Sequence, residues 1–170
     1  MDTLQTMNYE RENAQKKFDS ARSNLFLMIA LTLVNMVLLV LQTDVMLLFS
    51  ATVPYYAVAF GMALGSSSFL GGCICFAAII LLVYLLCWMF SKKHYGWMIA
   101  ALVLFVLDSL FMVRLYLSLE DFSGILDVVI HVWVLYYLVI GVKYGHQLKK
   151  MPEEMPMASE ETNFFGESKF

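Results

Sequence analysis

Four ionisable side chains lie within or at the edge of long apolar stretches of this chain, at Asp108, Arg114, Asp127 and His131. A charge in hydrocarbon is costly, so such residues are rare and mark ion or proton pathways as well as structural contacts. Two carboxylates beside an imidazole could form a proton relay or a cation-binding centre. The same groups could instead hold helices together, at about 1 kcal/mol for each hydrogen bond. The sequence leaves both interpretations open.

The spacing of these residues pairs them across a helical hairpin. Two apolar runs, 95–117 and 124–142, flank a short connection, so residues equally far from that connection lie at equal depth. This predicts that Asp108 faces His131 and that Arg114 is level with Asp127. Asp127 and His131 are also four residues apart and share a helix face. However, Asp108 and Arg114 are separated by about 120° around their helix, so both cannot point squarely at the second helix, and Arg114 can extend to the membrane surface instead.

A fifth polar residue, Asn35, lies in the apolar run 23–43, about 10 Å from the end of that run at 1.5 Å per residue. That depth is close to the level expected for Asp108 and His131. Three helices would then bring polar groups together, where a hydrogen-bonded network can satisfy them. The candidate polar cluster therefore comprises Asn35, Asp108, Arg114, Asp127 and His131.

The elements that position these residues are transmembrane helices. With 61% hydrophobic residues, 15% charged residues and a mean hydropathy of +0.72, the 170-residue chain departs from the composition of soluble domains. Its apolar runs 23–43, 69–90, 95–117 and 124–142 are each long enough to cross a bilayer. We therefore predict an all-α, polytopic transmembrane helix bundle with four spans. The domain organisation expected is an amphipathic cytoplasmic N-terminal helix (1–23), the bundle (24–146) and an acidic, disordered cytoplasmic tail (147–170).

The segment 45–64 is ambiguous, because it is long enough to be a fifth span. All Lys and Arg residues except Arg114 flank the four spans on one side if this segment enters and leaves the membrane on the same face. Basic residues collect on the cytoplasmic side, so we favour a re-entrant or interfacial hairpin broken near Pro54. The alternative is five spans. The hairpin topology places both termini in the cytoplasm, and we expect a multi-pass protein of the plasma membrane.

Small residues recur at spacings of three or four around that hairpin. Such surfaces let helices approach closely, within the bundle or between chains. Besides lipid, the expected partner is a second copy of this chain or another membrane protein. The residues concerned are Ala57, Gly61, Gly65, Ser68 and Gly72.

The chain shows no HExxH, GxSxG, P-loop or CxxC motif, so the sequence does not favour an enzyme. Cys73 and Cys75 point to opposite faces of a helix and cannot share a metal, and we expect no cofactor. The basic residues flank membrane segments and form no extended patch, which argues against nucleic acid as a partner.

The runs NYERENAQKKFDSARSNLFLMIALTLVN, LFSATVPYY and GILDVVIHVWVLYYLVIGVKYG resemble small uncharacterised multi-pass proteins of bacterial genomes. The resemblance covers much of the chain and implies no activity. Three function classes follow from the residues themselves. A non-enzymatic scaffold or accessory subunit of a membrane complex is favoured, a proton- or cation-linked transporter or channel subunit is the alternative, and a membrane-embedded enzyme using Asp108, Asp127 and His131 is the third.

Overall fold

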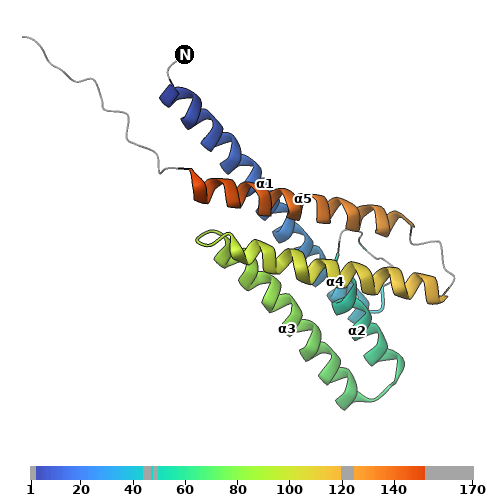
Figure 1. Ribbon diagram of the computed structural model, residues 1–170. Helices are drawn as coiled ribbons and strands as arrows, with labels where there is room; N and C mark the ends of the chain where they lie inside the picture. The colour runs from blue at the N-terminus through green and yellow to red at the C-terminus, as the bar shows by residue number, and fades with distance from the viewer. Residues whose placement is uncertain (1–2, 44–46, 48–49, 120–124, 152–170) are drawn as a thin grey trace, which may run out of the picture.

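The computed structural model describes residues 3–43, 47, 50–119 and 125–151, and the part of the chain that it describes is built from helices (Figure 1). In chain order these are α1 (Thr3–Val40), α2 (Thr52–Ala63), α3 (Ser67–Ser91), α4 (Gly96–Leu119) and α5 (Ile125–Lys150). Four of them, α1, α3, α4 and α5, are long and apolar enough to cross a membrane. The predicted all-α bundle with four spans is confirmed.

α2 is the short helix between the first two spans. Its 12 residues cover about 18 Å at 1.5 Å per residue, which is too short for a hydrocarbon layer of about 30 Å. The chain is extended at Ala51 and enters the helix at Thr52, so the expected break lies just before Pro54. Pro54 occupies the first turn, where a missing N–H costs no helical hydrogen bond. The structure therefore has a short helix here and not the fifth span of the alternative prediction.

α1 is a single helix of 38 residues, so the helix expected at 1–23 continues without a break into the first span. Its N-terminal half packs along the C-terminal half of α5. Two glycines allow this close approach, because an added Cβ at Gly141 would lie 2.9 Å from Ala21 Cβ and one at Gly145 would lie 2.9 Å from Phe18 Cε2. The acidic tail predicted at 147–170 lies outside the described residues beyond Met151.

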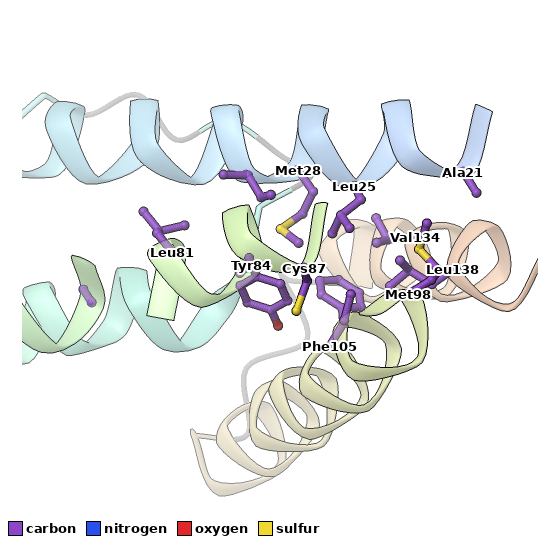
Figure 2. Packing of buried hydrophobic residues seen from close by; sticks show 14 of the residues in the cluster. Ala21, Leu25, Met28, Leu81, Tyr84, Cys87, Met98, Phe105, Val134 and Leu138 are labelled. Atoms are coloured by element: carbon purple, nitrogen blue, oxygen red, sulfur yellow. The ribbon is translucent and has the colours of Figure 1, made fainter. Parts of the chain in front are cut away.

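The apolar core lies where α1, α3, α4 and α5 meet. Figure 2 shows Leu25 and Met28 of α1 above Tyr84 of α3 and Phe105 of α4, with Leu138 of α5 beside them. These side chains are at most 1% exposed. Most other large apolar side chains of the four long helices point outward, as expected for helices that face lipid.

The basic clusters of the sequence meet at one end of the bundle, which we call the basic end. The Arg22 side chain donates to Ser91 Oγ at 3.0 Å, immediately before the pair Lys92–Lys93. Lys17 Nζ donates to the Tyr144 hydroxyl at 2.8 Å, next to Lys143. The first span, the α3–α4 connection and the end of α5 therefore carry their cations on the same side of the bundle.

Candidate functional site

The candidate site surrounds the N-terminus of α2, inside the bundle. Asp108 is twelve residues into α4 and His131 is twelve residues before Lys143, so each lies about 18 Å from the basic end. Asp108, Asp127 and His131 are 4%, 6% and 2% exposed. Thr52, at the start of α2, reaches the same level. The site therefore lies near the middle of a hydrocarbon layer about 30 Å thick.

Asp108 caps α2 from a neighbouring helix. Its Oδ2 accepts a hydrogen bond from the backbone N–H of Thr52 at 2.8 Å, and its Oδ1 accepts one from Val53 at 2.7 Å. The first N–H groups of a helix have no partner within the helix, and its N-terminus carries a partial positive charge. Ala51, the residue at the N-cap position, makes no side-chain capping bond. Asp108 therefore supplies both the missing acceptors and the complementary charge.

His131 lies between Asp108 and Asp127. Its Nε2 is 3.1 Å from Thr52 Oγ1 and 3.4 Å from Asp108 Oδ2, and its Nδ1 is 3.0 Å from the backbone carbonyl oxygen of Asp127. A carbonyl oxygen only accepts, so Nδ1 carries a hydrogen and donates it. Nε2 is the nitrogen that faces α2. The ring stacks on Phe105 at 5.1 Å between centroids, which fixes its plane.

Asp127 is the less satisfied of the two carboxylates. Its Oδ2 accepts from the Tyr116 hydroxyl at 3.0 Å, whereas its buried Oδ1 has no hydrogen-bond partner among the residues that the structure describes. The nearest charged contact of Oδ1 is His131 Nδ1 at 3.6 Å, beyond good hydrogen-bond distance. Asp127 also lies in the first turn of α5, where the helix dipole favours a negative charge.

Two polar residues of α1 hold the chain that leads into α2. Asn35 Nδ2 donates to the carbonyl of Leu47 at 2.6 Å and to Ser50 Oγ at 2.9 Å, and its Oδ1 accepts from the Leu47 N–H at 2.7 Å. Thr32 Oγ1 accepts from the Ala51 N–H at 2.8 Å. The segment that leads into α2 has backbone N–H and C=O groups that cannot form hydrogen bonds with hydrocarbon. Asn35 and Thr32 of α1 form hydrogen bonds with several of these groups.

The structure thus brings Asp108, Asp127 and His131 into contact, with Asn35 joined to them through the segment 50–52. Arg114, expected level with Asp127 or extended to the membrane surface, is not brought into the cluster. Among the described residues no ion pair joins them, and the Arg114 side chain is exposed. Tyr116 takes that place, because it lies closer to the side of α4 that carries Asp108 (about 80° away, against about 120° for Arg114).

The small residues fall into two groups. Gly61 is a packing contact between α2 and α3, because an added Cβ would lie 2.9 Å from Cys73 Cβ and 3.2 Å from Leu70 Cα. Ala57 is half-buried on the same helix. Gly65, Ser68 and Gly72 are exposed, and a Cβ at Gly65 or Gly72 would meet no atom of the described residues within 4 Å.

Sequence reasoning missed Thr52 and Tyr116. The signal for Thr52 was available, because a threonine followed closely by a proline is typical of a helix start and places the N-terminus of α2 there. Tyr116 carries no such signal, since an aromatic residue near a membrane surface is usually an interfacial anchor.

Comparison of the chain with protein-family models, with curated proteins and with solved structures finds no match.

Proposed function

We propose that this protein is a non-enzymatic scaffold or accessory subunit of a membrane complex, built to hold the α2 hairpin inside the bilayer. The observation that carries this proposal is the use of Asp108. This buried carboxylate makes two short hydrogen bonds to the backbone of α2. His131, Asn35 and Thr32 also bind α2 or the chain leading into it. These hydrogen bonds therefore hold α2 in position.

The exposed small residues support a protein partner. Ser68 and Gly72 lie on the outward side of α3, where a side chain would normally face lipid. Small residues at a spacing of four are typical of helix–helix contacts in membranes, because they let two backbones approach. In this proposal the scaffold presents the α2–α3 side of the bundle to another transmembrane chain. The membrane concerned is the plasma membrane, with both termini in the cytoplasm, following the position of the basic end.

Site-specific photo-crosslinking in native membranes tests the scaffold proposal. A photoreactive residue at Gly72 should give a discrete crosslinked product with a second membrane protein. The same residue at Val129, an exposed position of α5, is the matched control and should give lipid adducts only. Equal protein crosslinking at both positions, or none at Gly72, contradicts the proposal.

A proton-linked transporter or channel subunit is the second candidate, favoured by one observation. Asp127 Oδ1 is a buried carboxylate oxygen without a hydrogen-bond partner in the described part of the chain, and it lies next to an imidazole that also contacts Asp108. Proteoliposomes containing a pH-sensitive dye separate the two functions. A scaffold leaves an imposed pH gradient intact, whereas a proton pathway dissipates it and Asp127→Asn abolishes that flux.

A further inference from the structure

One exposed place at the basic end gathers positive charge, with no carboxylate paired to it among the residues that the structure describes. Lys17 of α1 and Lys143 of α5 both approach the ring of Tyr144, with their Nζ atoms 4.7 Å and 5.7 Å from its centroid. Lys17 also donates to the Tyr144 hydroxyl at 2.8 Å. Two ammonium groups from different helices are therefore held beside a single half-buried tyrosine.

Neither lysine has a carboxylate partner among the described residues. The ion pairs there involve Lys16, Arg22 and His131, and none includes Lys17 or Lys143. Like charges held close together repel each other, and an anion between them lowers the energy. The helices α1 and α5, which carry the two lysines, are held together next to this place, because Gly145 lets Phe18 of α1 pack directly against α5.

The position of this place relative to the apolar runs identifies the anion. Lys143 directly follows the apolar run 124–142, and Lys17 reaches the same level through Tyr144. That level is the polar headgroup layer, where anionic lipids attract basic residues and tyrosine is enriched. We propose that Lys17, Lys143 and Tyr144 form a binding site for the phosphate of an anionic phospholipid headgroup. This inference is independent of the proposed scaffold function.

The test uses the full chain in nanodiscs of equimolar phosphatidylcholine and phosphatidylglycerol, with retained lipid measured by native mass spectrometry after extraction. The wild-type protein should retain phosphatidylglycerol in preference to phosphatidylcholine. The double variant Lys17→Gln/Lys143→Gln should bind it roughly thirtyfold less tightly, because each charge-assisted hydrogen bond from these lysines to the phosphate contributes on the order of a fivefold gain.

Lys92→Gln/Lys93→Gln is the matched control, because it removes the same charge at the same end of the bundle. It should keep most of the preference. An equal loss in both double variants would show a general attraction of cations to the membrane and overturn the proposal. An excess of inorganic phosphate should leave the retained lipid in place. If phosphate displaces it, or if the wild type shows no preference, the lipid site is also overturned. Both lysines are exposed, and either single variant gives the same readout if the double variant fails to fold.

Discussion

Replacing Asp108 tests the physical role that the structure gives to the cluster. Asp108→Leu replaces a buried carboxylate with an apolar side chain of similar size. The N–H groups of Thr52 and Val53 then lose the oxygens that accept their hydrogen bonds. A buried group left unsatisfied costs about 1–3 kcal/mol. Hydrogen bonds within membrane proteins average about 0.6 kcal/mol and reach about 1.7, because the unfolded state in the membrane also finds partners. Each of the two bonds to a carboxylate at a helix N-terminus should lie near the upper of these values. We therefore expect Asp108→Leu to lower the free energy of unfolding by about 2–3 kcal/mol.

Asp108→Asn should have a smaller effect, of about 1 kcal/mol. It keeps one oxygen as an acceptor, but its amide group cannot accept from the second N–H, and the favourable charge at the helix N-terminus is lost. The expected order of stability is therefore wild type, then Asp108→Asn, then Asp108→Leu. Arg114→Gln on the same helix is the matched control and should change stability by less than about 0.5 kcal/mol, because its side chain is exposed.

Two measurements check this prediction. Reversible unfolding in mixed micelles gives the free energy of unfolding for each variant. Hydrogen exchange followed by mass spectrometry reports on the peptide that contains Thr52 and Val53, where a local loss of 2 kcal/mol speeds exchange by roughly thirtyfold. The reasoning is refuted if Asp108→Leu is as stable as Arg114→Gln, or if exchange accelerates evenly along the chain and not at the start of α2.

Three further substitutions separate packing from polar contacts. Gly61→Ala should destabilise the protein by about 1–3 kcal/mol, since its Cβ would overlap Cys73, whereas Gly72→Ala should be neutral or stabilising by up to about 1 kcal/mol. Thermal unfolding in detergent compares the two variants, and equal effects would show that α2 and α3 do not pack as described. Asn35→Leu should speed hydrogen exchange in the segment 47–51 while leaving exchange in α4 unchanged, because three hydrogen bonds to that segment are lost. Unchanged exchange in the segment 47–51 would contradict the role given to Asn35.

The four-span bundle could be predicted because length, hydropathy and basic residues all point to it. The Asp108–His131 contact could be predicted for a related reason. A short connection between two long helices fixes relative depth, and depth alone places these two residues opposite each other. Their side chains are 3.4 Å apart in the structure. The relative depth of Asp108 in α4 and His131 in α5 therefore agrees with the depth expected from residue spacing.

The capping of α2 by Asp108 could not be predicted. It depends on where a half-helix that begins after a loop docks against α4, and no repeat or spacing in the sequence sets that position. Arg114 shows what equal depth leaves open. Rotation around α4 decides which side chain faces α5, and Tyr116 is better placed than Arg114 by about 40°. Depth follows from counting residues, whereas docking and rotation follow from the packing of the whole bundle.

Accessibility of single cysteines on either side of α2 tests the central claim most directly. In a background with Cys73, Cys75 and Cys87 replaced by alanine, Gln42→Cys and Ser67→Cys should react with a membrane-impermeant thiol reagent from the same side of sealed vesicles. Lys92→Cys should react only from the other side. If Gln42→Cys and Ser67→Cys are labelled from opposite sides, the segment between them crosses the membrane, and the account of α2 as a helix held within the bilayer by Asp108 is wrong.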